Sequence, residues 1–369
     1  MTYLGRPDYR HGSTERAAVL LVNLGTPDAP TPGAVRRYLR EFLSDPRVIE
    51  LPRLLWLPLL YGVILPLRSR RSAKAYHEVW TEQGSPLMVH TRNLAEGLQR
   101  ALATDERPLT VRMAMRYGNP SIASVLDELR AEGVRRLLVL PMYPQFSATT
   151  TASVFDAVVD ALKRWRWTPE LRFITDYHRE PAWLDAVANS VRAHWNTHGR
   201  GERLLFSFHG IPKRYFRSGD PYHCLCHHGA REVASRLGLG PQEWTLSFQS
   251  RVGREEWLKP YTDETVRTLA KEGVRRLDVV CPGFAVDCLE TVEEIAGENA
   301  EYFREAGGET LSYIPALNDS PAHVQALLPL LLRHGSGWAE FDPAPWPVAA
   351  QQAEEAERAA RFERFQAPE

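Results

Sequence analysis

Short apolar runs alternate with amphipathic segments along most of the chain. The apolar runs cover 18–25, 109–118, 134–144 and 171–178. Between them lie stretches of helical periodicity, such as 121–132, which are about 10–15 residues long. Strands that alternate with helices of this length are typical of a parallel sheet covered on both faces. The pattern therefore predicts an α/β fold of the doubly wound, Rossmann-like type.

The second half of the chain repeats the first. The sequence EGVRRL occurs at 132–137 and again at 272–277, each time between a predicted helix and an apolar strand. LLFSFHGIP at 204–212 also echoes LLVNLGTP at 20–27. One explanation is that junctions between a helix, a glycine and a strand simply look alike. We favour a duplication, which predicts two similar Rossmann-like domains with a cleft between them.

This organisation divides the chain into four parts. We expect an N-terminal arm over 1–16, a first α/β domain over 17–180 and a second over 181–334. The Pro- and Trp-rich segment and the charged helical pattern over 335–369 predict a terminal extension docked on the body. Ligands of open α/β sheets bind beyond the carboxyl ends of the strands, so we expect the functional residues in the loops that follow the strands.

Composition and charge narrow the class of protein. The 369 residues carry 45 Lys and Arg against 46 Asp and Glu, so electrostatic capture of nucleic acid by the whole chain is not expected. Four cysteines cannot form a disulfide scaffold. The first 18 residues contain no apolar stretch, which argues against a secretory signal and a periplasmic solute-binding protein. We expect a cytoplasmic protein with reduced thiols.

The most apolar segment is 51–67, LPRLLWLPLLYGVILPL. Three prolines and Arg53 interrupt it, and a spanning helix needs about 20 apolar residues, so it should not cross a membrane. The basic sequence RSRR follows at 68–71. The segment could be a buried helix with a loop, an interfacial element at a lipid surface, or the rim of an apolar pocket.

Two groups of residues could carry chemistry. His209 ends the predicted strand LLFSF, where a histidine suits a proton acceptor or a metal ligand. Glu290, Glu294 and Glu298 recur every four residues, which places three carboxylates along one face of a helix. Oxygen ligands of this kind suit hard cations and also Fe²⁺, although a solvated acidic face is the commoner reason for such spacing.

Other motifs are weaker. HCLCHH at 223–228 could bind a metal, but Cys224 and Cys226 lack the two-residue spacer of zinc modules, so free thiols are favoured. GxGxxG and the phosphate-loop pattern are absent, so no nucleotide cofactor is indicated.

Taken in order, several motifs between residues 17 and 334 resemble the ferrochelatases, which insert Fe²⁺ into a porphyrin at the end of haem synthesis. The motifs are LLVNLGTPDAP, GSPL, MRYGNP, MYPQFSATT, LLFSFHGIP, GDPYHCLC, LSFQSRVGREEWLKPYTDE and CPGFAVDCLETVEEI. Each piece is weak alone, but the ordered set is specific. The resemblance implies the family's two Rossmann-like domains with a cleft, in agreement with the internal repeat.

The resemblance also implies roles for the acidic and histidine residues. The histidine of SFHG is the family's active-site residue, here His209, and the glutamate of its D-x-x-E-T stretch is here Glu290; both are candidate metal ligands. Glu294 and Glu298 match positions along a path for protons or metal. Some relatives carry a second histidine where this chain has Cys288, so that role does not transfer.

The porphyrin pocket is implied in the same way. Arg116 and Tyr117 match the family's RY pair near the macrocycle, Tyr143 matches the strand-end YPQ, and Trp257 matches an aromatic residue of the pocket wall. The segment 51–67 matches the lip that covers the porphyrin and is thought to touch the membrane.

The resemblance implies protoporphyrin IX and Fe²⁺ as substrates, with a monomer or a homodimer as the assembly. The aliphatic lip favours protoporphyrin over the four-carboxylate coproporphyrin. No [2Fe–2S] cluster is expected, since residues 289–369 contain no cysteine. A cobalt or nickel chelatase is an alternative, but Glu290 with Cys288 favours iron. A porphyrin carrier is a second alternative, and it would not need His209 facing Glu290.

Overall fold

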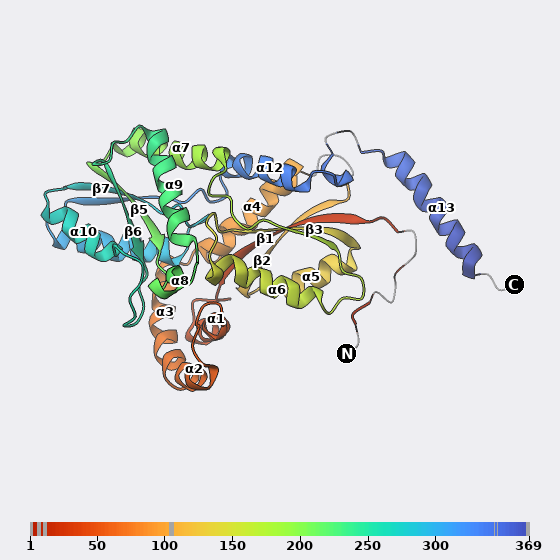
Figure 1. Cartoon of the computed structure of the whole chain (residues 1–369), viewed down its shortest axis with the longest axis horizontal. Helices are drawn as coiled ribbons and strands as arrows, with labels where there is room; N and C mark the ends of the chain where they lie inside the picture. Colours follow the sequence, from red (N-terminus) through yellow and green to blue (C-terminus); the bar gives the residue numbers. More distant parts are fainter. Residues whose placement is uncertain are drawn as a thin grey trace.

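A computed structural model describes residues 3–5, 9, 13–102, 107–342, 344 and 346–366. It contains two parallel sheets of four strands each (Figure 1). The first has the order β2-β1-β3-β4 and the second β6-β5-β7-β8, so the same strand order occurs twice. The strands are β1 (Arg16–Thr26), β2 (Leu109–Gly118), β3 (Val134–Pro141), β4 (Glu170–Phe173), β5 (Arg203–His209), β6 (Trp244–Gln249), β7 (Arg276–Val280) and β8 (Thr310–Ile314). The α/β class and the two Rossmann-like sheets are confirmed.

Helices connect and cover the strands. In chain order they are α1 (Pro32–Ser44), α2 (Arg53–Leu59), η1 (Leu60–Ile64), α3 (Leu65–Val79), α4 (Pro86–Leu102), α5 (Ile122–Ala131), η2 (Ala148–Ala152), α6 (Ser153–Leu162), α7 (Pro181–His198), α8 (Lys213–Arg217), α9 (Tyr222–Leu237), α10 (Thr262–Lys271), η3 (Glu290–Asn299), α11 (Ala300–Glu305), α12 (Pro321–Gly335), η4 (Ala339–Phe341) and α13 (Val348–Gln366).

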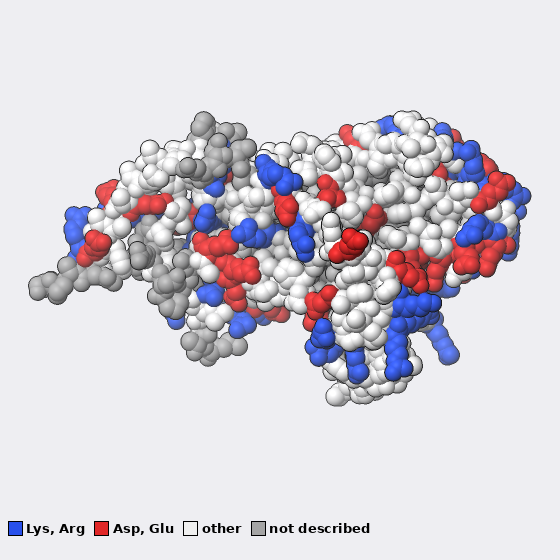
Figure 2. Space-filling view, turned by 180° about the vertical axis from the view of Figure 1, so that it is seen from behind, with Lys and Arg blue, Asp and Glu red and all other residues white. Residues whose placement is uncertain are grey.

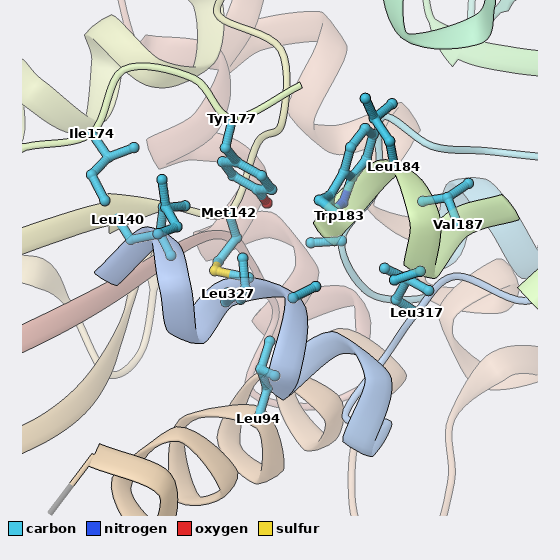
Figure 3. Packing of buried hydrophobic residues seen from close by; sticks show 14 of the residues in the cluster. Leu94, Leu140, Met142, Ile174, Tyr177, Trp183, Leu184, Val187, Leu317 and Leu327 are labelled. Carbon is cyan, nitrogen blue, oxygen red and sulfur yellow. The ribbon is translucent and has the colours of Figure 1, made fainter. Parts of the chain in front are cut away.

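One apolar core joins the two sheets. Alternate residues of β1, such as Val19 and Leu21, and alternate residues of β5, such as Phe206 and Phe208, belong to the same buried cluster. The helices α4, α7, α9 and α12 contribute many of its other members. In Figure 3 Leu327 of α12 lies among side chains of both units. The opposite faces of the two sheets are covered separately, by α5 and α6 on the first and by α10, η3 and α11 on the second.

Helix α12 is the last regular element of the second half, yet it packs on the first. Its Val324 approaches α4 so closely that a Cβ on Gly97 would lie 2.9 Å from a Val324 methyl group. Leu94 and Leu98 of α4 share the core with Leu327. Glycine at position 97 therefore permits the close packing of α4 and α12. The domain limits 17–180 and 181–334 stay a prediction.

The apolar segment 51–67, which we call the lip, projects from the body together with α3 (Figure 1). Its inner side is buried, since Trp56, Leu60 and Leu65 are at most 8% exposed. Its outer side is open, with Leu54 at 90% and Leu55 at 73% exposure. The buried-helix interpretation is therefore right for one side only. In Figure 2 basic groups flank this uncharged lobe.

The C-terminal extension docks through a short part of its length. Trp338, Glu340 and Phe341 are buried, and Arg136 of β3 forms an ion pair with Glu340. Helix α13 instead points away from the body in Figure 1, and most of its residues are exposed. Glu355 of α13 accepts a hydrogen bond from Thr14, just before β1, and how far the extension docks on the body stays a prediction.

Candidate active site

The alternation of side chains along β5 places His209 on the same face of the sheet as Leu205. Phe206 and Phe208 face the shared core, whereas Leu205 packs with Ile295 of η3 on the opposite face. His209 ends the strand on this second face and is partly exposed. Its Nδ1 lies 2.7 Å from the carbonyl oxygen of Gly210. If Nδ1 carries the proton for this bond, Nε2 is free to accept a proton or bind a metal.

The glutamates lie on a π-helix, not on the α-helix that their spacing suggested. The π-helix η3 begins at Glu290 and ends at Asn299. Its hydrogen bonds span five residues instead of four, and π-helical turns are rare and frequent at functional sites. The wider turn keeps side chains four residues apart near one face, so Glu290 and Glu294 share a side of the helix. Glu298 lies at its far end, where its charge acts on Glu293.

Two residues at the end of β6 tie the π-helix to the sheet. The side chain of Gln249 accepts a hydrogen bond from Ser207 of β5 at 2.8 Å and donates one to the carbonyl of Glu290, also at 2.8 Å. Ser250 donates to the Glu294 carboxylate from its backbone nitrogen at 2.7 Å and from its hydroxyl at 2.5 Å. Sequence reasoning missed both roles, although both residues lie in the LSFQSRVG motif.

The Glu294 carboxyl has a raised pKa. Burial raises its pKa, and the nearby charge of Glu290 acts in the same direction. The bonds from Ser250 and the charge of His209 act against this, but the pKa stays above the usual range. His209, Glu290 and Glu294 therefore form one electrostatically connected group.

Aromatic rings stand beside His209. The ring centroids of Trp257 and Phe284 lie 6.3 and 6.5 Å from that of the imidazole. Trp257 is held in place because the next residue, Leu258, donates a backbone hydrogen bond to Ile211 at 3.0 Å. The structure thus places Trp257 and Phe284 beside His209, and the porphyrin-binding role of Trp257 stays a prediction.

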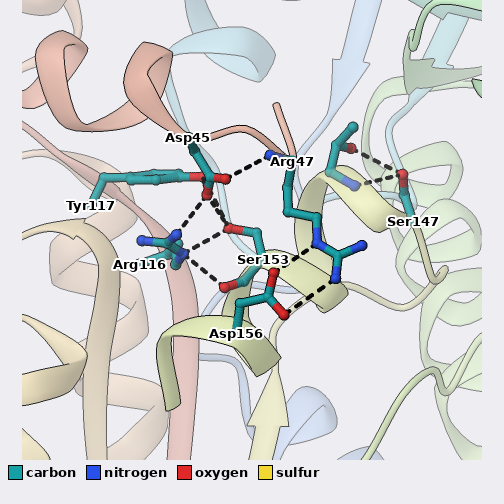
Figure 4. A network of polar contacts seen from close by, with 8 residues as sticks. Asp45, Arg47, Arg116, Tyr117, Ser147, Ser153 and Asp156 are labelled. Carbon is teal, nitrogen blue, oxygen red and sulfur yellow. Dashed lines mark hydrogen bonds and ion pairs between the residues drawn. The ribbon is translucent and has the colours of Figure 1, made fainter. Parts of the chain in front are cut away.

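Arg116 and Tyr117 lie in a polar network centred on Asp45 (Figure 4). One Asp45 oxygen accepts hydrogen bonds from Arg116 at 2.6 Å, from the Tyr117 hydroxyl at 2.7 Å and from Ser153 at 2.6 Å. Burial acts to raise the pKa of Asp45, but these bonds together with that from the backbone of Arg47 and the Arg116 charge hold it below its usual value. Arg116 and Tyr117 therefore anchor the segment that leads into the lip.

The hydroxyl of Tyr143 is buried within electrostatic range of both Arg116 and Glu290. Burial raises its pKa, and the charges of Arg116 and Glu290 both act on it. A small cavity beside Glu290 is lined by Cys288 and by two tyrosines, Tyr38 and Tyr76, whose pKa values burial also raises. These two tyrosines had no motif that singled them out.

The sequence HCLCHH lies on helix α9, behind the opposite face of the second sheet. Cys226 is buried, Cys224 is exposed, and both are free thiols. The ring of His223 stacks against Phe248 at 5.7 Å. In the described part of the chain no group of three or more His, Cys, Asp or Glu side chains is arranged to hold a metal ion.

The structure thus has a histidine at the end of β5 and carboxylates on the helix η3. A model of the ferrochelatase family matches residues 16–334. The chain belongs to the ferrochelatase family. Its activity is the insertion of Fe²⁺ into protoporphyrin in haem synthesis, which makes it a metal chelatase and makes the metal a substrate.

Bacterial ferrochelatases are similar over almost the whole chain. That of Thioalkalivibrio sulfidiphilus is 59% identical over 362 residues, covering 97% of this chain and 98% of its own. That of Nitrosococcus oceani is 53% identical and covers 97% of each chain. Among solved structures, SirB from Bacillus subtilis with Fe3+ has a TM-score of 0.53 at 13% identity, covering 89% of this ferrochelatase and 100% of that chain. At that identity the likeness shows a common fold alone.

Proposed function

We propose that His209 and Glu290 are the catalytic pair and that both can hold Fe²⁺ as it enters the macrocycle. The observation that carries this is the electrostatic connection of His209, Glu290 and Glu294 at the carboxyl end of β5. The porphyrin loses two pyrrole protons as the metal enters, so the site must accept protons and deliver a cation. Neutral imidazole and carboxylate can each do both.

The small number of protein ligands fits a metal in transit. Three protein ligands in binding geometry would hold the ion as a resident group, whereas a histidine and a carboxylate leave coordination positions open for the porphyrin nitrogens. Trp257 and Phe284 supply aromatic surface beside His209, against which a planar macrocycle can pack. Glu294 and then Glu298 continue the acidic path along η3, away from the pocket.

Glu294→Gln is expected to change the pH dependence of iron insertion. Because the pKa of Glu294 is raised, its carboxylate is lost at a less acidic pH than that of an ordinary glutamate as the pH falls. Wild-type turnover should decline on this acid side. Glutamine does not titrate, so the variant should be slower by about tenfold or more and lose that decline.

Initial rates measured anaerobically between about pH 5 and 8 check this prediction. Glu301→Gln is the matched control, since Glu301 is an exposed glutamate of α11. If the rate of Glu294→Gln fell at low pH in the same way as the wild-type rate, Glu294 would not be the group that titrates in the rate-determining step.

We infer that the lip rests on a membrane surface. No helix of the described chain is long and apolar enough to cross a bilayer. The lip instead exposes Leu54, Leu55 and Leu67 next to exposed Arg70 and Arg71. Leucine side chains can insert at the boundary between the lipid headgroups and the acyl chains. Each basic residue near an anionic membrane surface adds about 1 kcal/mol to the free energy of membrane binding. A peripheral contact would let an apolar porphyrin enter without crossing water.

Changing Leu54 and Leu55 together to Asp should weaken binding to vesicles that contain anionic lipid. Burial of one leucine side chain is worth about 1.5–3 kcal/mol, so the double variant should bind at least about tenfold more weakly in a sedimentation assay. Leu332→Asp is the control, because Leu332 is an exposed leucine of α12 far from the lip in sequence. Equal binding of both variants and wild type would contradict a membrane role for the lip.

A further inference from the structure

The short helix α8 joins two walls of the candidate pocket. It spans Lys213–Arg217 and begins four residues after His209, so the chain passes directly from the catalytic strand into it. The intervening Gly210 is tightly enclosed, since a Cβ there would lie 3.0 Å from the Gln249 carbonyl oxygen and 3.1 Å from the Trp257 ring. The connection between His209 and α8 therefore has little freedom to move.

The first wall held by α8 is the segment that carries Trp257. The backbone nitrogen of Lys213 donates to the carbonyl of Glu256 at 2.9 Å, and Leu258 donates to Ile211 at 3.0 Å. These two backbone bonds bracket Trp257, whose ring lies beside the imidazole. The catalytic histidine and the aromatic wall are thus fixed to the same short helix.

The second wall is the base of the lip, which we define as residues 45–50. The Tyr215 hydroxyl donates a hydrogen bond to the carbonyl of Val48 at 3.0 Å. The neighbouring Arg214 forms an ion pair with Glu50 at 2.8 Å and with Glu255 at 2.7 Å. The Arg214 guanidinium also lies 4.3 Å from the centroid of the Tyr215 ring.

The lip in turn reaches the glutamate side of the pocket. Leu289, the residue before Glu290, packs against the buried cluster that contains Trp56, Leu60 and Leu65 of the lip. The lip is therefore in contact with η3 on one side and, through its base, with α8 on the other.

We propose that Tyr215 and Arg214 are positioning residues that set the place of the lip relative to His209 and Trp257. They touch no reacting atom, and they act through the lip base. The proposal rests on the proposed function, because it assumes that the lip covers a porphyrin bound beside His209. In this proposal α8 is a rigid connection between β5, which carries His209, and the lip, which covers the pocket.

The two residues contribute unequally. Tyr215 is 5% exposed, and its hydrogen bond to a backbone carbonyl is shielded from water. Burial raises the pKa of Tyr215, which keeps the hydroxyl protonated and able to donate. The Arg214 side chain is 38% exposed, and exposed ion pairs contribute little. Tyr215 should therefore contribute more than Arg214 to holding the lip base in place. The Arg214 guanidinium lies against the Tyr215 ring and restricts its movement.

Tyr215→Phe removes only the hydroxyl and keeps the buried ring. We expect hydrogen exchange of the backbone amides over 45–56 to accelerate about fivefold, the factor that corresponds to one lost hydrogen bond. The KM for protoporphyrin should rise by a similar factor of about five, while kcat stays within about twofold because His209 and Glu290 are unaltered. Adding Arg214→Gln should increase both effects.

Arg217→Gln is the matched control. Arg217 belongs to the same helix, but its side chain is exposed. It should leave exchange and KM at wild-type values. The proposal is overturned if Tyr215→Phe leaves lip exchange unchanged, or if it accelerates exchange equally in β5 and lowers kcat as well. If wild type failed to insert iron, the proposed function would be lost, and the exchange comparison would still decide whether α8 fixes the lip.

Discussion

His209→Ala should abolish iron insertion and leave porphyrin binding intact. The substitution removes the imidazole whose charge acts on Glu294, and loss of one proton acceptor alone costs about 10²–10⁴ in rate. The same imidazole is a candidate ligand for Fe²⁺, so we expect a loss at the upper end of this range. Trp257, Phe284 and the lip do not depend on the imidazole, so the affinity for protoporphyrin should change by less than about threefold.

Anaerobic turnover of protoporphyrin IX with Fe²⁺, followed by absorbance, measures the first effect, and fluorescence titration of the porphyrin measures the second. His223→Ala is the matched control, because His223 stacks on Phe248 behind the other face of the sheet. Insertion at the wild-type rate by His209→Ala would contradict the assignment of the pair. Binding without insertion in wild type as well would indicate a porphyrin carrier.

Asp45→Asn should cause the largest loss of stability. Asp45 is 6% exposed and accepts hydrogen bonds from Arg116, Tyr117 and Ser153 (Figure 4). Asparagine removes the charge that compensates Arg116, and breaking a buried pair costs about 3 kcal/mol in the free energy of unfolding. Since the network holds the segment before the lip, the variant should also bind porphyrin more weakly. Guanidinium denaturation and porphyrin titration measure the two effects.

Asp156→Asn is the control from the same network. Its partner Arg47 is a partly exposed side chain, so the loss should stay below about 1 kcal/mol. The pH dependence gives an independent check. The pKa of Asp45 is lowered in the folded state, so its contribution is present above the ordinary carboxyl pKa of about 3.9 and is lost as the pH falls below it. The difference between wild type and Asp45→Asn should therefore shrink below about pH 4.

The strands and their order in the chain could be read from the sequence because buried parallel strands are continuous apolar runs. The strand expected over 134–144 ends at Pro141, which has no amide hydrogen to continue the ladder, and its neighbour β4 ends at Phe173 instead of residue 178. The spatial order of the strands was not predicted and comes from the structure alone. The position of α12 between both sheets could not be predicted, because its apolar pattern shows that one face is buried but not which element it packs against.

Several residues of the candidate site that belong to a sequence motif could be predicted. His209, Glu290 and Trp257 follow from the motifs, and the structure places Trp257 beside the histidine. The π-helical form of η3 was not predictable, because a period of four residues also fits an α-helix. Asp45 and Tyr215 were missed, since their roles depend on hydrogen bonds to residues more than 70 positions away or to a backbone carbonyl.

The place of α12 has a consequence for the order in which the chain can fold during synthesis. Domains generally fold as they leave the ribosome, with the N-terminal one first. Here Leu94 and Leu98 of α4 receive their cover from Leu327, more than 200 residues later in the chain. The first sheet can therefore form early, but its inner face stays open to water and to chaperones until nearly the whole polypeptide has been made.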